Sequence, residues 1–303
     1  VIFCKEKILF ITIKSFIMRT SGINYLIFVR NSLVIVFMFC CCFDASAHGD
    51  LLKRILSLTE EIKVHSDSAN LYFKRGKLYY QHNDFNNSLE DFKSSQKLGF
   101  NSNEQYFFLA KNHSKLNHFN TSKRYIDKIL KVQPNNVNAF KLLGQINFKK
   151  RKFKKSAWAY EKVIMFSKKT FPENYLDASK AWYALRTENG TERAQSLLIK
   201  GIKEMGDNIV LYHKLILINV DLGDYSSAIK FQKKVIDFSP RKERSYLKLA
   251  NLQFLQENYT EAIKSLAIAK KYYSDLPSRI KNTKFMKEFY SELELKENMF
   301  KNE

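Results

Sequence analysis

Residues 137–170 read VNAFKLLGQINFKKRKFKKSAWAYEKVIMFSKKT, and the pattern of this stretch recurs along the chain at a step of 34 residues. Three kinds of position keep the step: a small residue, an aromatic residue, and a Ser or Ala. They are Gly76, Ala110 and Gly144; Phe85, Phe119 and Phe153; Ser88, Ser122 and Ser156; and, farther along, Ala194, Ala228 and Ala262. Such a fixed step indicates a repeat protein, in which each repeat buries its apolar face against its neighbours.

Each repeat contains two stretches with the apolar periodicity of an amphipathic helix. In the first repeat, Tyr72 and Leu78 belong to one helix, Asn83-Asp84 form the turn, and Phe92 belongs to the second helix. The small positions are expected where the two helices cross closely. Proline lacks a backbone donor, and all the prolines fall after a second helix; they are Pro134, Pro172, Pro240 and Pro277.

This pattern resembles the tetratricopeptide repeat (TPR) family. The residues that carry the resemblance are Tyr72, Gly76, Tyr79 and Phe85; Tyr106, Ala110, Phe119 and Pro134; Phe140, Gly144, Phe153 and Tyr160; Tyr212, Tyr225, Ala228 and Pro240; and Tyr246, Ala250, Tyr259 and Ala262. The resemblance implies an all-α fold, a right-handed superhelical solenoid of antiparallel helix pairs. The expected solenoid covers 69–276 in about six repeats: 69–102, 103–136, 137–170, 175–208, 209–242 and 243–276. The fourth is degenerate, because Trp182 and Thr191 replace its small and aromatic residues.

Flanking helices are expected at both ends, because a terminal repeat would otherwise leave its apolar face in water. The segment 48–68 is expected to hold a helix over 51–63 that Asp50 caps. The segment 277–303 is expected to hold a capping helix that starts at Ser278 and reaches about residue 298, followed by a tail.

The first 47 residues have the features of a secretory signal. Leu33–Phe43 is an uninterrupted apolar run, and Ala45-Ser46-Ala47 is a small-residue cleavage pattern, so we expect cleavage after Ala47 and export to the periplasm or medium. Residues 1–17, ahead of Met18, are interpreted as a possible upstream extension. Three alternatives stay open: an uncleaved membrane anchor at 23–43, lipidation within Cys40–Cys42, and a buried core helix.

The chain shows no enzyme motif. All the cysteines, which are Cys4, Cys40, Cys41 and Cys42, precede the repeats, so a disulfide framework, a zinc finger and a catalytic thiol are excluded from the main body. Glycine-rich phosphate loops, zinc-protease helices and hydrolase nucleophile elbows are also absent from the sequence. We therefore expect a non-enzymatic protein without a cofactor. One alternative is a metal-handling or enzyme-accessory role for His48, which would be the first mature residue and could chelate copper with its terminal amine.

The chain is strongly basic, with 51 Lys and Arg against 30 Asp and Glu, a formal net charge of +21. A basic helical repeat could bind nucleic acid, and this is a second alternative. Export argues against it, so the leading hypothesis is an exported scaffold that binds a partner protein or peptide. The sequence leaves the oligomeric state open.

The resemblance also implies a binding site, because first helices line the concave groove in TPR proteins. The mapped groove residues are Phe73, Lys77, Tyr80, Phe107, Lys111, Lys141, Gln145, Phe148 and Lys149. Lysines interleaved with aromatics suit an extended acidic peptide, although a lysine-rich composition alone would also make the surface basic. The C-terminal half of the groove is expected to be more apolar, with Leu176, Tyr183, Leu217, Val220, Leu247, Phe254 and Leu255. The family's carboxylate clamp is not matched, since Phe73, Lys77 and Phe108 occupy its positions.

Overall fold

The computed structural model of the chain describes residues 49–301, and this part consists of helices and short connections, with no strand among the described residues. The predicted all-α fold is therefore confirmed. The expected signal segment, the cysteines and His48 lie outside the described residues.

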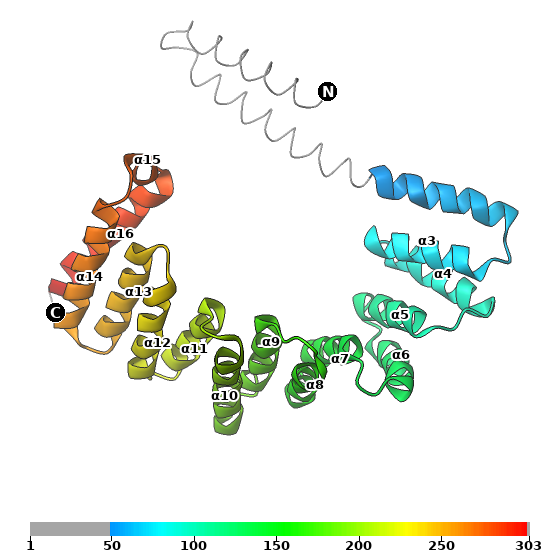
Figure 1. The fold of residues 1–303 in the computed structure, drawn as a ribbon, viewed down its shortest axis with the longest axis horizontal. Coiled ribbons are helices and arrows are strands. Elements are labelled where there is room, and N and C mark those ends of the chain that lie inside the picture. Colours follow the sequence, from blue (N-terminus) through cyan, green and yellow to red (C-terminus); the bar gives the residue numbers. More distant parts are fainter. Residues whose placement is uncertain (1–48, 302–303) are drawn as a thin grey trace, which may run out of the picture. The chain divides into compact units, whose positions relative to one another are not determined.

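The helices follow one another in pairs along the sequence (Figure 1). Their bounds are Ala69–Gln81 (α3) and Phe85–Lys97 (α4), Asn103–Lys115 (α5) and Phe119–Val132 (α6), Val137–Lys149 (α7) and Phe153–Phe166 (α8), Pro172–Tyr183 (α9) and Glu188–Met205 (α10), Ile209–Asp221 (α11) and Tyr225–Phe238 (α12), and Lys242–Leu255 (α13) and Tyr259–Ser274 (α14). A helix over 49–64 precedes them, and Ser278–Lys281 (α15) and Lys284–Lys301 (α16) follow.

The chain divides into two compact units. The N-terminal unit ends at Leu116 and contains α3, α4 and α5, whereas the C-terminal unit begins at Asn117 and contains α6 to α16.

Three predicted boundaries differ from the structure. The fourth pair begins at Pro172 and not at 175, because proline fits the first turn of a helix, where its missing donor has no partner to lose. Asp50 lies inside the 49–64 helix, since residue 49 is already helical, and so does not cap it. Ser278 opens only the single turn of α15; Thr283 caps α16, its hydroxyl accepting a hydrogen bond from the Met286 amide at 3.3 Å.

The small residues are explained by how the two helices of a pair cross. A Cβ atom added to Gly144 would lie 2.9 Å from the Tyr160 ring, and one added to Gly76 would lie 2.9 Å from the Phe92 ring. The serine of the second helix also forms a hydrogen bond at this crossing. The Ser156 hydroxyl donates to the Gly144 carbonyl at 2.8 Å, and the Ser88 hydroxyl does the same to Gly76 at 2.7 Å. The crossing therefore combines close packing with a buried hydrogen bond.

Both ends of the described chain are covered by packed helices. In the N-terminal unit, Ile55 and Ile62 of the 49–64 helix are buried. In the C-terminal unit, α16 packs on α14, and the Phe300 ring stacks on Phe254 with centroids 4.5 Å apart. These helices cover the apolar faces that the end repeats would otherwise expose.

The turn inside each helix pair contains one residue in the left-handed region of backbone space. These residues are Asn83, Asn117, Arg151, Arg186, Gly223 and Glu257. Only Gly223 has the residue type that adopts this conformation without steric cost. At Glu257, with a φ of 63°, the Cβ atom is strained against the backbone.

We expect Glu257→Gly to raise the free energy of unfolding by about 0.5–1 kcal/mol, because relief of left-handed strain outweighs the extra chain entropy of glycine. The Glu257 side chain is exposed, so little packing is lost. Urea unfolding of both proteins measures the difference. Glu261→Gly, in the first turn of helix α14, is the control and should destabilise, because it loses helix propensity and the ion pair with Lys264. A loss of stability in Glu257→Gly would contradict this account of the turn.

Candidate functional site

Some first helices of neighbouring pairs contact each other. In the N-terminal unit α3 contacts α5, and in the C-terminal unit α9 contacts α11. The solvent-facing sides of α3 and α5, and those of α9 and α11, therefore adjoin. Most of the residues predicted to bind a partner lie on these helices, and their surroundings decide what the surface can bind.

In the N-terminal unit, two lysines lie over aromatic rings. The Lys111 Nζ atom is 4.4 Å from the ring centroid of Tyr80, 5.6 Å from that of Phe107 and 5.2 Å from that of Phe108. The Lys77 Nζ atom is 5.5 Å from the Phe108 centroid. We call these five residues the N-terminal cluster. An ammonium group over a ring face is attracted by the ring's quadrupole, so the rings hold the lysine heads in place.

Phe73 was predicted to line the groove, but it is a core residue. It exposes only 5% of its surface, and its ring lies 4.8 Å from Phe100 and 5.6 Å from Phe92. Phe108, which the sequence mapping did not place in the groove, is half-buried and forms part of the aromatic floor instead. Phe73 on α3 and Phe108 on α5 both lie near the boundary between the core and the surface. The spacing of residues alone did not show which of the two is buried and which is partly exposed.

The two lysines of the N-terminal cluster differ in their charge partners. Lys77 forms an ion pair with Glu104, at 2.9 Å. Lys111 pairs with no carboxylate in the described part of the chain, and burial, with the nearby charge of Lys115, lowers its pKa. A carboxylate brought by a ligand would relieve this unfavourable setting. Lys111 is therefore the strongest candidate for a charged contact to a partner.

In the C-terminal unit, three of the predicted residues meet at one hollow. Gln145, Phe148 and Lys149 of α7 line a space of about 190 Å³ together with Tyr160, Asp177 and Lys180. The Lys180 Nζ atom lies 5.0 Å from the Phe148 ring centroid. The fourth predicted residue of α7, Lys141, acts on this hollow through its charge. Burial raises the pKa of Asp177, and Lys141 and Lys180 partly oppose that rise.

Farther along the C-terminal unit, the structure reveals a row of lysines on successive first helices. Lys180, Lys214 and Lys248 lie on α9, α11 and α13 at steps of 34 residues, and we call them the lysine row. Burial lowers the pKa of Lys214, and the charges of Lys180 and Arg186 lower it further. This half of the surface was expected to be more apolar; it does expose Leu217 and Leu255, and the lysine row adds cationic heads to it. The 34-residue recurrence of the three lysines was the signal in the sequence.

The same contact recurs in both units. The Lys214 Nζ atom lies 5.4 Å from the ring centroid of Tyr183, on the preceding first helix. Lys180 lies over Phe148, and Lys111 over Tyr80, in the same way. In each case the aromatic ring belongs to one first helix and the lysine to the next. The arrangement displays cationic heads on an apolar floor at three steps, from α3 to α5, from α7 to α9 and from α9 to α11.

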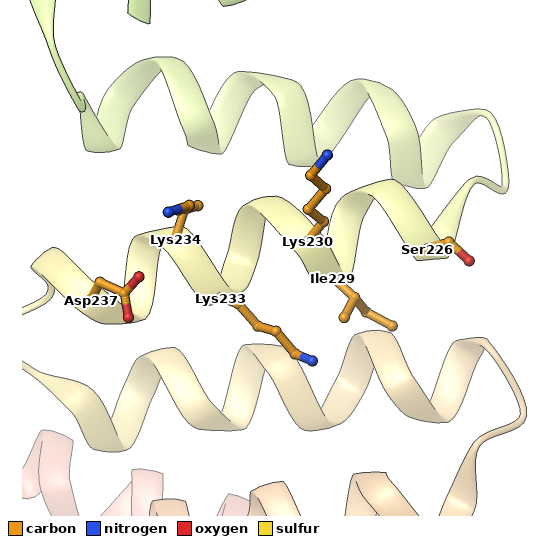
Figure 2. A pocket seen from close by; sticks show the side chains of 6 residues that line it. All are labelled: Ser226, Ile229, Lys230, Lys233, Lys234 and Asp237. Carbon is orange, nitrogen blue, oxygen red and sulfur yellow. The ribbon is translucent and has the colours of Figure 1, made fainter.

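A second hollow, of about 390 Å³, lies on the second-helix side of the C-terminal unit. Figure 2 shows its lining, which α12 alone supplies: Ser226, Ile229, Lys230, Lys233, Lys234 and Asp237. This surface is also basic, but no aromatic residue lines it. It therefore provides a natural control, in which lysines occur without an aromatic floor.

Residues 49–301 contain no group of three or more His, Cys, Asp or Glu side chains that could hold a metal ion. No helix in this part of the chain combines the length and the apolar character that crossing a membrane requires. The candidate His48 lies outside the described residues.

Comparisons with known proteins bear on the fold. The family model of the Fis1 C-terminal tetratricopeptide repeat matches residues 103–152. The crystal structure of the C-terminal part of a TPR repeat-containing protein from Cytophaga hutchinsonii is similar with a TM-score of 0.63 and 13% identity, covering 78% of this chain and 95% of that chain. A tetratricopeptide repeat protein from Parabacteroides merdae gives a TM-score of 0.51 and 14% identity, with coverages of 78% and 92%. No curated protein sequence matches the chain. At these sequence identities the solved structures show only that the fold is shared. The predicted resemblance to the TPR family is therefore confirmed for the fold.

Proposed function

We propose that this chain, with its tetratricopeptide-repeat fold, is an exported, non-enzymatic scaffold that binds an extended acidic segment of a partner protein along its first helices. The fold is of a kind that serves protein–protein interaction. The single observation that carries the proposal is the repeated placement of a lysine head over an aromatic ring of the preceding first helix.

The chemistry of this surface favours an acidic and partly apolar ligand. Half-buried rings such as Phe107 and Phe148 can bury apolar side chains of a ligand. The lysines attract carboxylates and speed encounter with an acidic segment. Because the arrangement recurs from one first helix to the next, a segment of alternating acidic and apolar residues would match it.

The proposed export rests on the sequence of Leu33–Phe43 and Ala45-Ser46-Ala47. N-terminal sequencing of the mature protein tests it, and the expected sequence is His-Gly-Asp-Leu-Leu. A mature chain that still contains Leu33–Phe43 would support the alternative of an anchor at 23–43.

The binding site is tested with a labelled extended peptide in which glutamates flank single Phe and Leu residues, together with a copy in which lysines replace the glutamates. We expect Phe107→Ala to weaken binding of the acidic peptide at least about fivefold, since losing an aromatic anchor costs over 1 kcal/mol. Lys111→Glu should mainly slow association, most strongly at low salt. Kinetic binding assays at two salt concentrations measure both effects.

The matched control is Lys230→Glu on α12, which changes the net charge by the same amount on a surface without an aromatic floor (Figure 2). We expect it to leave binding unchanged. If Phe107→Ala and Lys111→Glu bind as the wild type does while Lys230→Glu disrupts binding, the proposed site is wrong and the basic first-helix surface reflects composition only.

A further inference from the structure

The most concentrated charge of the described chain lies around helix α8 and plays no part in the proposed binding of a segment. Residues 150–171 contain seven lysines and Arg151, against a single carboxylate, Glu161. That carboxylate is already engaged, because Glu161 accepts hydrogen bonds from Trp182 at 2.6 Å and from Arg193 at 3.0 Å. The segment therefore presents an almost purely positive surface.

Large apolar side chains stand exposed among these lysines. Trp158 exposes 50% of its surface and Met165 exposes 67%, although both types are usually buried. Lys155, Trp158, Lys162 and Met165 follow one another at spacings of three and four residues, so they occupy one face of α8. We call this face the α8 stripe. Just beyond the helix, Phe171 exposes 51% of its surface beneath Lys169, whose Nζ atom lies 5.6 Å from the ring centroid.

The surface beside the stripe extends the positive charge. A hollow of about 360 Å³ borders Trp158 and is lined on its other sides by residues that include Lys123, Lys150 and Lys152. The carboxylate in this hollow, Asp127, is neutralised by an ion pair with Lys123 at 2.6 Å. The cationic surface thus reaches from the α8 stripe across to α6 and α7.

We propose that the α8 stripe docks the protein onto the surface of an anionic lipid bilayer. Tryptophan prefers the boundary between headgroups and acyl chains, and neighbouring apolar side chains can enter that layer. Lysines around them are attracted to anionic headgroups. Trp158 and Met165 are two turns apart, about 10 Å along the helix axis, so the apolar contacts spread along a line and do not gather in one pocket. That distribution fits a planar, fluid partner.

A nucleic acid is the other polyanion that such a surface could attract, and the geometry around Trp158 disfavours it. Single-stranded nucleic acid binds by stacking its bases on free aromatic faces. Here the Lys162 Nζ atom lies 5.7 Å from the Trp158 ring centroid, and the Phe140 ring meets Trp158 edge-on at 5.7 Å. Met165 offers no ring for stacking. The exposed apolar groups are therefore better suited to insertion among lipids than to stacking with bases.

Vesicle binding by the full chain tests the proposal, with vesicles of phosphatidylglycerol and phosphatidylcholine compared with vesicles of phosphatidylcholine alone. Intrinsic fluorescence is informative, because the chain has only two tryptophans, Trp158 and Trp182. We expect anionic vesicles to shift the emission to shorter wavelength, brominated lipids to quench it, and both effects to vanish in Trp158→Phe. This readout reports on α8 itself, so membrane binding by the apolar run near the N-terminus does not imitate it.

A charge comparison completes the test. Lys155→Glu with Lys162→Glu should weaken binding to anionic vesicles at least tenfold, since each lysine near an anionic surface contributes about 1 kcal/mol. Lys230→Glu with Lys233→Glu on α12 makes the same change in net charge and should have a much smaller effect (Figure 2). Equal effects of the two pairs, or emission that vesicles do not change, would overturn the proposal. Binding of a single-stranded oligonucleotide that depends on the stripe, without binding to vesicles, would assign the surface to nucleic acid and also overturn it.

Discussion

Replacing Asp91 with alanine is expected to remove about 3 kcal/mol from the free energy of unfolding of the N-terminal unit, because it leaves a largely buried guanidinium without its counter-charge. The side chain of Asp91 is only 6% exposed and accepts two hydrogen bonds from Arg75, at 2.7 and 2.8 Å. Arg75 also donates to the Thr59 hydroxyl at 3.0 Å, so one side chain connects the 49–64 helix, α3 and α4. Urea unfolding followed by helical circular dichroism measures the loss.

Two further variants make this prediction specific. Glu90→Ala removes an adjacent carboxylate on the exposed side of α4, where it pairs with Lys93, and should change stability little. Arg75→Met combined with Asp91→Leu removes both charges, and much of the loss should return, because buried ion pairs can be replaced by packed apolar residues. If Asp91→Ala is as stable as Glu90→Ala, the pair does not hold these three helices together.

Tyr175→Ala is expected to cost about 3–5 kcal/mol in the C-terminal unit, the range for deleting a large buried ring. Tyr175 is fully buried in α9, and a Cβ atom added to Gly201 of α10 would lie 2.8 Å from its ring. Its hydroxyl donates to Glu204. The ring therefore fills the space between the two helices of the fourth repeat.

Tyr175→Phe separates the packing of the ring from the hydrogen bond of the hydroxyl. It keeps the ring, so it should retain most of the stability and lose only about 1 kcal/mol for the hydrogen bond. Thermal unfolding of the three proteins measures both steps. Equal losses in Tyr175→Phe and Tyr175→Ala would show that the hydroxyl contact, and not the ring, holds α9 to α10.

The helix pairs could be predicted from the sequence because each repeat carries its own crossing residues. Gly144, Ser156 and Tyr160 form one crossing, and their equivalents recur at the same step. The degenerate repeat was placed three residues too late, because the register was carried over from its neighbours. At the C-terminal end, apolar periodicity predicted one capping helix. It did not predict that the helix is interrupted between α15 and α16, where Thr283 caps the start of α16.

The candidate site was less predictable, because a repeat register gives a side chain's position on a helix and not its burial. Phe73 and Phe107 both map to groove positions, yet contacts with Phe92 and Phe100 bury Phe73. Lys180 and Lys214 were not among the mapped groove residues, and only the structure places them over Phe148 and Tyr183. Long lysine side chains reach over a neighbouring helix, and spacing within one helix cannot show that.

The central claim is that the first helices, and not the second helices, contact the partner segment. Photo-crosslinking tests it most directly, with a benzoylphenylalanine placed at Phe107 on α5, at Tyr183 on α9 or at Lys230 on α12, and with the labelled acidic peptide as the probe. The account predicts crosslinks from positions 107 and 183, competed by unlabelled acidic peptide and not by its lysine copy, and none from position 230. Crosslinking from position 230 alone, or equal crosslinking of the acidic and the lysine peptides, would contradict it.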